Sequence, residues 1–286
     1  SPRIVMTNGD SPGTFREVLN GRHVVYVGAL DEHELRNVFV QSREPDGDLS
    51  VTTGEQGHKG GLVGVDNGTL FFENVRVPRS MLLDRYGGVD EQGRYVSVIE
   101  SPNRRFFTML GTLVRGRVCI SVGGAIAARR GISIATRYAL KRRQFPAPGR
   151  RDGVLLLDYL IHQRRLLPLL AHTYALHFAQ EIVASDLHDV FSGITTEEQD
   201  RRLLESRAAG TKAIGTWHAT RTIQECREAC GGAGFISENR FAALKADTDV
   251  FTTFEGDNHV LLQLVAKGLL TDYSSDFSDL DQLGMA

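Results

Sequence analysis

The hydrophobic pattern of this chain changes near residue 101, from short segments with strand character to long segments with helical spacing. Before that point, runs rich in β-branched and aromatic residues predict strands at His23–Leu30, Asn37–Val40 and Thr69–Val77. After it, apolar residues recur at helical spacing through Asn103–Arg142, which predicts a first long helix. Ser101 and Pro102 supply an N-cap and a proline at the first helical position, so the helix is expected to begin there.

Two more long helices are expected in the middle of the chain. One covers Leu155–Ser185, with a kink at Pro168, because proline lacks the N–H that the helical ladder needs. Thr195 followed by Glu198 forms a capping-box pattern, which predicts the start of the next helix, and that helix runs to about Cys230.

The last helix is expected over Asp257–Leu270, after a loop from Phe235 to Glu255. The segment Thr271–Ala286 is rich in aspartate and predicts a solvated tail or the start of further structure. Four long helices at this spacing predict an antiparallel bundle. The expected fold class is therefore α+β, with a partial β-domain over residues 1–100 followed by an antiparallel four-helix bundle over residues 101–286.

Composition and charge narrow the kinds of partner. The chain has 286 residues, of which 41% are hydrophobic, so it can bury a sizeable core. Its 33 basic and 35 acidic side chains nearly cancel, which points away from nucleic acid. Cys119, Cys226 and Cys230 form no metal-like pattern with histidine, so no metal site is expected. A reducing compartment is the default for a chain with so few cysteines.

The expected localisation is cytoplasmic. No signal peptide is visible, and no uninterrupted apolar run is long enough to predict a membrane span. The last three residues, Gly284-Met285-Ala286, are not a peroxisomal tripeptide.

The stretch FTTFEGDN, residues 251–258, carries the most distinctive candidate chemistry. Glu255 lies between an aromatic residue, Phe254, and a flexible glycine, Gly256. An aromatic wall removes water from a carboxylate, which makes it a better proton acceptor. The alternative is that Glu255 only complements the dipole of the helix that follows it.

Two other segments have both a structural and a functional interpretation. The basic run KRRQF, residues 141–145, ends the first long helix, where cations complement the helix dipole, but it could also clamp the phosphates of a nucleotide cofactor. The sequence CGGAGF, residues 230–235, follows the third helix. A helix end explains one glycine but not three, so a close approach of the backbone to a ligand is the better interpretation.

Together these motifs resemble the acyl-CoA oxidase and acyl-CoA dehydrogenase superfamily, the oxidase branch most closely. The similar segments are GVDNGTLFFENVRVPRSMLLDRYGGV (64–89), a helix ending in KRRQF, CREACGGAGFISENRF (226–241) and DTDVFTTFEGDN (247–258). Several motifs in the right order are more specific than any one of them. The resemblance implies an acyl-CoA dehydrogenase-like C-terminal bundle, FAD as cofactor, a fatty acyl-CoA substrate, and self-association as a dimer or tetramer or pairing with a related subunit.

The resemblance also implies roles for individual residues. Glu255 would remove the α-proton of the acyl-CoA, with its own backbone N–H helping to hold the thioester carbonyl. Hydride would leave the β-carbon for the flavin, giving a trans-2-enoyl-CoA, with oxygen as the electron acceptor. Arg117 would lie near the acyl-CoA. The residues expected at FAD, in part the FAD of a neighbouring subunit, are Arg142, Gln144, Phe145, Gly231, Gly232, Asp257 and Asn258.

The sequence also departs from the family pattern. Pro146 stands where the family has a glycine, which affects the turn beside the expected FAD contact. Val5–Thr14 is only weakly similar to the family's flavin-contacting strand, and no N-terminal helical domain is recognisable. The chain therefore looks truncated at both ends. Because of the missing segments, a non-catalytic partner subunit or inactive fragment stays open as an alternative. A dehydrogenase that uses an electron-transfer flavoprotein also stays open, since the sequence does not show how oxygen reaches the flavin.

Overall fold

The computed structural model describes residues 24–31, 34–41, 51–65, 67–72, 84–146, 148–149 and 151–284. The chain divides into two compact units, Ser1–Gly111 and Thr112–Ala286. The segment Val5–Thr14 and the end of the expected strand Thr69–Val77 lie outside the described residues. The assignment of residues 1–100 and 101–286 as two domains of the family stays a prediction.

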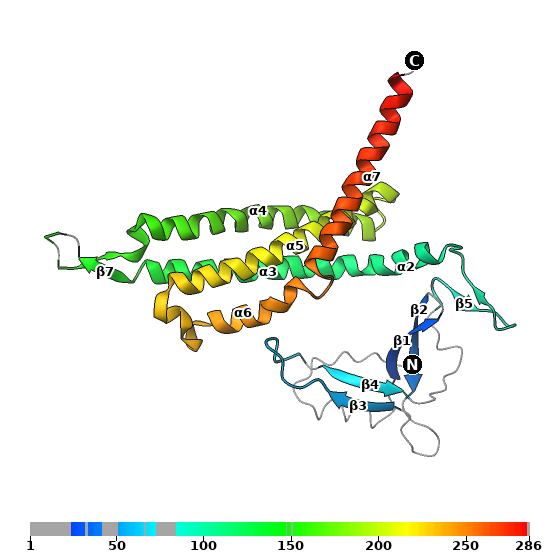
Figure 1. Cartoon of the computed structure of the whole chain (residues 1–286), viewed down its shortest axis with the longest axis horizontal. Coiled ribbons are helices and arrows are strands. Elements are labelled where there is room, and N and C mark those ends of the chain that lie inside the picture. Colours follow the sequence, from blue (N-terminus) through cyan, green and yellow to red (C-terminus); the bar gives the residue numbers. More distant parts are fainter. Residues whose placement is uncertain are drawn as a thin grey trace. The chain divides into compact units, whose positions relative to one another are not determined.

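Strands of the first unit pair as antiparallel ribbons, and one short helix follows them (Figure 1). β1 (Val24–Asp31) pairs with β2 (Glu34–Gln41) from Val24 opposite Gln41 to Asp31 opposite Glu34. The other described pairs are β3 (Val51–Glu55) with β4 (Gly68–Phe72), and β5 (Gly88–Val89) with β6 (Tyr95–Val96). The helix α2 (Pro102–Leu110) begins at the expected proline. The strand character predicted for this region is confirmed.

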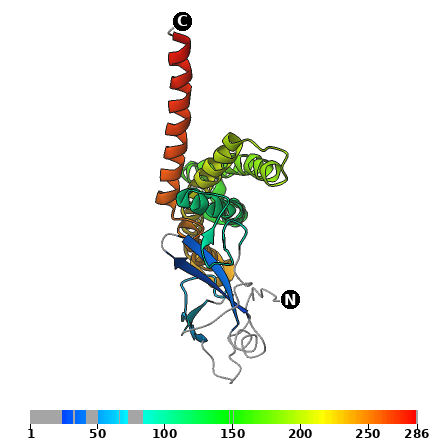
Figure 2. The ribbon, with the colours of Figure 1, turned by 90° about the vertical axis from the view of Figure 1, so that its right-hand side faces the viewer.

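The second unit is a helical bundle with a small β-ribbon at one end. Its long helices are α3 (Val114–Ala139), α4 (Leu160–Phe191), α5 (Glu198–Ala229) and α7 (Asn258–Gly284). The remaining elements are β7 (Arg143–Pro146), β8 (Gly153–Leu155), α6 (Phe241–Asp249) and short 3-10 turns, among them η4 (Gly231–Phe235) and η6 (Val250–Thr252). Figure 1 shows α3, α4 and α5 aligned, and Figure 2 shows α7 extending beyond them. The predicted helical bundle is confirmed.

Small residues let α3 and α5 pack closely. A side chain at Gly124 of α3 would meet the carbonyl oxygen of Gly215 of α5 at 3.4 Å, and one at Gly131 would meet Ile223 at 3.7 Å. Along both helices the buried residues around these points are mainly alanine, glycine, serine and threonine. Because the two backbones come so close, the residues on α3 and α5 that face the final loop are held at fixed positions relative to each other.

Several local expectations were wrong. The capping box does not form: the N-cap of α5 is Glu197, it makes no side-chain cap bond, and the Thr195 hydroxyl is buried without a partner among the described residues. Thr195 instead donates its backbone N–H to the Asp189 carbonyl, which turns the chain before α5 begins. The expected loop from Phe235 to Glu255 contains the helix α6.

The last helix is longer than the sequence predicts. The expected tail after Leu270 continues α7 to Gly284. α4 passes through Pro168 as one helix, as expected, because the proline removes only one ladder bond. The kink expected at Pro168 stays a prediction. In the described residues, α3 alone is long and apolar enough to cross a membrane, and half of its most apolar window is buried in the bundle. Core helices commonly meet the same criterion, so this signal is weak.

Candidate active site

Glu255 has an uncommon backbone and an unpartnered carboxylate oxygen. It follows η6 and adopts φ +55, in the left-handed region that residues other than glycine rarely occupy. Its Oε2 atom is buried, and no described residue donates a hydrogen bond to it. A buried oxygen without a donor is costly, so a feature of this kind is retained where it has a use. The structure therefore leaves one oxygen of Glu255 available as an acceptor.

The Glu255 carboxylate lies directly against helix α3 at Gly116. A Cβ atom at Gly116 would lie 2.7 Å from Oε1 of Glu255 and closer still to Oε2 and Cδ. Any other residue at this position would overlap the carboxylate. Gly116 is thus the floor of the site, and its missing side chain makes the space that the carboxylate occupies.

Two cations hold the backbone at Glu255 and Gly256. Arg117 of α3 donates from Nε to the carbonyl oxygen of Glu255 at 3.3 Å. Lys212 of α5 donates from Nζ to the carbonyl oxygen of Gly256 at 2.6 Å and to Oδ1 of Asn258 at 3.0 Å. Burial lowers the pKa of Arg117, against the raising influence of Glu205 and Glu255. Burial also lowers the pKa of Lys212, to about 8.

Asp257 and Asn258 both have structural partners at the start of α7. Asp257 accepts the backbone N–H of His259 at 2.9 Å and that of Val260 at 3.3 Å through Oδ1, so it caps the helix. Asn258 is 1% exposed. Its Nδ2 donates to the Ala213 carbonyl at 3.2 Å and to Thr216 Oγ1 at 2.9 Å. Their cofactor contacts stay a prediction.

Aromatic residues cover one side of the loop before Glu255. The rings of Phe251 and Phe254 stack with their centroids 5.3 Å apart, at an interplanar angle of 14°. A side chain at Gly123 of α3 would meet the Phe251 ring at 3.5 Å, so Phe251 packs onto α3. The loop is therefore anchored by ring packing as well as by the two cations.

Arg142, Gln144 and Phe145 lie at the far end of α3, in or beside β7. All three are exposed, and Phe145 is 77% exposed with φ +45. The strand is irregular here, because the pairing with β8 shifts between Gln144 and Pro146. A residue before proline normally prefers an extended backbone. The left-handed Phe145 departs from this preference at the point where the pairing of β7 with β8 shifts.

Gly231 and Gly232 form the start of η4, directly after α5. A side chain added at either would meet nothing within 4 Å, so open space borders both of them. Gly231 also has φ +59, which favours glycine. Gly234 differs, because its Cβ would overlap the Arg227 carbonyl. The loop therefore needs glycine at positions 231 and 234 for its own geometry, while Gly232 is open to a ligand.

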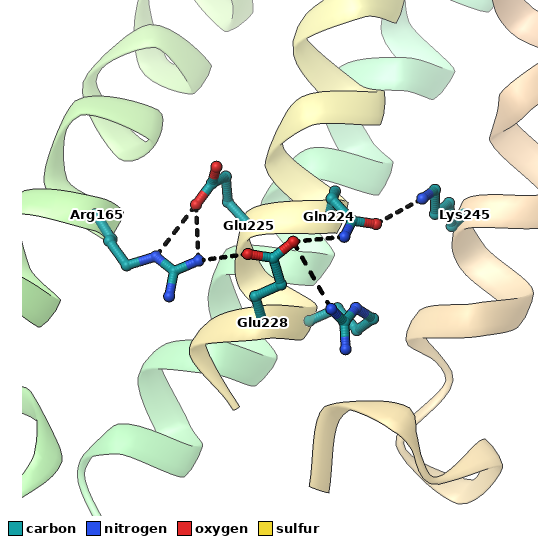
Figure 3. Close-up of polar contacts among 6 residues, drawn as sticks. Arg165, Gln224, Glu225, Glu228 and Lys245 are labelled. Atoms are coloured by element: carbon teal, nitrogen blue, oxygen red, sulfur yellow. Dashed lines mark hydrogen bonds and ion pairs between the residues drawn. The ribbon is translucent and has the colours of Figure 1, made fainter. Parts of the chain in front are cut away.

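An ionic network fixes the end of α5 just before this loop. Figure 3 shows Arg165 of α4 bound to Glu225 and Glu228 of α5, with Nη2 at 3.0 and 2.9 Å from their carboxylate oxygens. Gln224 donates to Glu228 at 2.6 Å and accepts from Lys245 of α6 at 2.5 Å. The hydrogen bond from Gln224 is the main cause that lowers the pKa of Glu228. The network joins three helices and so orients the glycine loop.

The structure separates the expected site residues into two groups. The first surrounds Glu255, with Arg117, Asp257 and Asn258. The second contains the β7 residues and the two glycines of η4, at the end of the bundle where α3 and α5 finish (Figure 1). The α3 segment Gly116–Ala139 spans roughly 35 Å at 1.5 Å per residue, so the two groups do not share one compact pocket.

Metal and thiol chemistry have little support in the described part of the chain. No group of three or more His, Cys, Asp or Glu side chains there could hold a metal ion. Cys226 and Cys230 are buried, free thiols, and burial raises their pKa values to about 12 and about 11. Both are therefore inert packing residues at neutral pH.

Comparison with known proteins gives a consistent match. The acyl-CoA oxidase C-alpha1 domain family matches residues 110–270, more than half of the chain. The chain belongs to the acyl-CoA oxidase family. The resemblance drawn from its motifs is thereby confirmed.

Individual acyl-CoA oxidases are similar over most of this chain. The putative acyl-coenzyme A oxidase 3.2, peroxisomal, of Arabidopsis thaliana is 47% identical over 242 residues, which cover 84% of this chain and 35% of that protein. The crystal structure of acyl-CoA oxidase 1 from Yarrowia lipolytica matches with a TM-score of 0.76 and 32% identity, over 90% of this chain and 40% of that one. Acyl-CoA oxidase 2 of Caenorhabditis elegans, solved with bound FAD, ascaroside-CoA and ATP, matches with a TM-score of 0.74 and 26% identity, over 90% of this chain and 39% of that one.

The chain spans about a third of the length of the curated acyl-CoA oxidases that it matches. The cytoplasmic localisation predicted from the sequence is wrong: similar oxidases from Arabidopsis thaliana and Homo sapiens are named peroxisomal. The prediction relied on the last three residues of this chain. A targeting tripeptide belongs to the end of a whole protein, so its absence here carried no information.

Two residues of the site around Glu255 were missed by sequence reasoning. Lys212 lies in the run AAGTKAIGTW, where the neighbouring buried positions are small residues. A lysine on such a face is a signal of a buried polar contact, because lysine is almost never fully buried without partners. Gly116, between two arginines in VRGRV, carries no comparable signal.

Proposed function

We propose that this chain forms part of an FAD-dependent acyl-CoA oxidase, in which Glu255 removes the α-proton of a fatty acyl-CoA. The single observation that carries the proposal is the buried Oε2 of Glu255, left without a donor from the described residues and held in a left-handed backbone. A proton acceptor must have a free lone pair and a fixed position. Family membership supplies the reaction class.

The proposed chemistry assigns separate tasks to the side chain and the backbone of Glu255. The carboxylate takes the α-proton. The backbone N–H of the same residue, which bonds no other described residue, donates to the thioester carbonyl as its oxygen gains charge. FAD, when bound, accepts the hydride that leaves the β-carbon, and a trans-2-enoyl-CoA remains. Arg117 holds the backbone carbonyl of Glu255 and so helps to fix the base in place.

FAD fits the second group of residues. Gly232 borders open space, and Phe145 and Phe235 expose 77% and 75% of their surface. Open backbone beside exposed aromatic faces suits a large planar cofactor. Arg142 and Gln144 add polar side chains at the same end of the bundle. Since Glu255 lies roughly 35 Å away along α3, these residues serve the FAD of a second copy, which makes self-association part of the proposal.

Oxygen is the proposed electron acceptor, and the peroxisome the proposed location, because the relatives are named oxidases and several are named peroxisomal. The test uses the full-length enzyme that contains this chain, reduced anaerobically with a fatty acyl-CoA and then exposed to air. We expect loss of the oxidised flavin absorbance, followed by stoichiometric hydrogen peroxide. A reduced flavin that yields no peroxide would instead favour a dehydrogenase.

The role of Glu255 is tested by Glu255→Gln in the same enzyme. We expect acyl-CoA still to bind, measured by its perturbation of the flavin spectrum, while flavin reduction is abolished, because the amide has no basic oxygen. Reduction at the wild-type rate would remove Glu255 from the mechanism.

A further inference from the structure

Lys212 is a fully buried cation whose direct acceptors are neutral. The side chain is 0% exposed. Its Nζ donates to the Gly256 carbonyl and to the Asn258 side-chain oxygen, neither of which carries a charge. Burying an ammonium group is costly unless hydrogen bonds and nearby opposite charges compensate for the lost water. The charged groups around it are Asp257 and Glu255 on the final loop and Arg117 on α3.

The position of Lys212 relates it to the backbone of Glu255. The carbonyls of Glu255 and Gly256 belong to the two peptide groups on either side of Gly256. Arg117 holds the first carbonyl from α3, and Lys212 holds the second from α5. With both peptide planes fixed, Gly256, which has φ +109 and is otherwise the freest residue of the loop, has a single orientation.

Asn258 connects this arrangement to the first turn of α7. It accepts from Lys212 and donates to the Ala213 carbonyl and to Thr216, both on α5. Thr216 in turn donates to the Lys212 carbonyl at 2.9 Å. The start of α7 is thus bound to one face of α5, and the loop enters α7 at a fixed place.

We propose that Lys212 is a positioning residue for Glu255: together with Arg117 it clamps the two peptides around Gly256 and so holds the carboxylate over Gly116. The inference rests on the proposed role of Glu255 and extends it to a residue on another helix. The left-handed backbone of Glu255 persists because its surroundings determine it. Without the Lys212 contact, the carboxylate keeps its chemistry but loses its fixed place.

The test compares Lys212→Met with a matched control in the full-length enzyme carrying FAD. Methionine keeps the length of the buried stem and removes the donors. The control is Gln180→Met on α4, where a side chain of similar size is 4% exposed and donates to the Ser121 carbonyl and hydroxyl at 2.7 and 2.9 Å. Both changes remove two hydrogen bonds donated by a buried side chain, but only Lys212 bonds the loop of Glu255.

Anaerobic stopped-flow mixing with a fatty acyl-CoA gives the rate constant of flavin reduction and the acyl-CoA Kd separately. For Lys212→Met we expect the rate constant to fall about tenfold to a hundredfold while Kd changes less than about threefold, because a displaced base loses rate rather than binding. For Gln180→Met we expect a lower Tm and a rate constant within about twofold of wild type.

The outcomes distinguish a failure of the positioning role from a failure of the proposed function. A wild-type rate constant in Lys212→Met, or an equal loss in Gln180→Met, overturns the positioning role while the proposed function stands. A wild-type enzyme that acyl-CoA does not reduce overturns the proposed function, and the positioning role with it. If Lys212→Met does not fold, Lys212→Gln, whose amide is too short to bridge both acceptors, is measured in its place with the same criteria.

Discussion

Replacing Gly116 with alanine should displace the carboxylate of the proposed base, Glu255, while leaving Glu255 itself unchanged. The new Cβ would lie 2.7 Å from Oε1 of Glu255, whereas ordinary contacts of this kind begin at 3.4 Å, and Oε2 would be closer still. The carboxylate must therefore retreat by about 1 Å, a displacement that can cost roughly a hundredfold in rate. The helix itself gains, because alanine is favoured over glycine by up to about 1 kcal/mol in a helix interior.

The prediction is thus a separation of stability from activity. Gly116→Ala in the full-length enzyme is expected to keep or raise the wild-type Tm and to reduce flavin about a hundredfold more slowly with acyl-CoA. Gly123→Ala is the matched control on the same helix, since its Cβ would meet the Phe251 ring at an ordinary 3.5 Å. It is expected to reduce flavin at close to the wild-type rate. Thermal unfolding and anaerobic stopped-flow mixing measure the two properties.

One result would refute the reasoning about the site. If Gly116→Ala folds and reduces flavin as fast as wild type, the carboxylate of Glu255 does not act from its place over α3. If Gly116→Ala and Gly123→Ala are slowed equally, the effect belongs to the stiffness of α3 and not to the contact with Glu255.

Two further predictions concern the buried lysine and the glycine loop. Lys212 has its pKa lowered from 10.5 to about 8, so between these values the unfolded chain binds a proton that the folded chain does not. The free energy of unfolding of wild type, relative to Lys212→Met, should be constant below about pH 8 and rise by up to about 3 kcal/mol by pH 10.5. Chemical denaturation measures both free energies. A difference between the two proteins that does not change over this pH range would show that the pKa of Lys212 is not lowered by burial. Gly232→Ala should leave Tm unchanged and weaken FAD binding, because its Cβ enters open space, whereas Gly234→Ala should lower Tm, because its Cβ overlaps the Arg227 carbonyl. Equal Tm values for the two variants would show that the loop geometry is not as described.

The sequence predicts most of the helical framework because the helices follow from the spacing of apolar residues within each segment. The long helices and the first two strands follow from spacing and composition, but some bounds differ. The expected helix Asn103–Arg142 is divided at Gly111–Leu113 into α2 and α3, and the last helix continues past Leu270 to Gly284. The short helix α6 was missed, because its nine residues follow the left-handed Arg240 in a segment rich in turn residues. The capping box at Thr195 failed because the preceding turn is made with Asp189 instead.

Some site residues could be recognised from their sequence neighbours, and others reach the site only through the packing of distant helices. Glu255 was found from its neighbours Phe254 and Gly256, which are adjacent in sequence. Arg117 and Lys212 meet this loop from 138 and 44 residues away, and such contacts depend on how α3 and α5 pack. Only the resemblance to a family indicated Arg117, and nothing local distinguished Gly116 from the other glycines of α3.

The length of α3 between the two groups of site residues has a genetic consequence. If each catalytic centre takes its base from one copy and its distal loops from another, then alleles defective in Glu255 and alleles defective in Phe145 or Gly232 are complementary. In a cell that expresses one of each, random pairing of copies would restore roughly a quarter of the centres. Two proteins that are each inactive when alone would together recover activity.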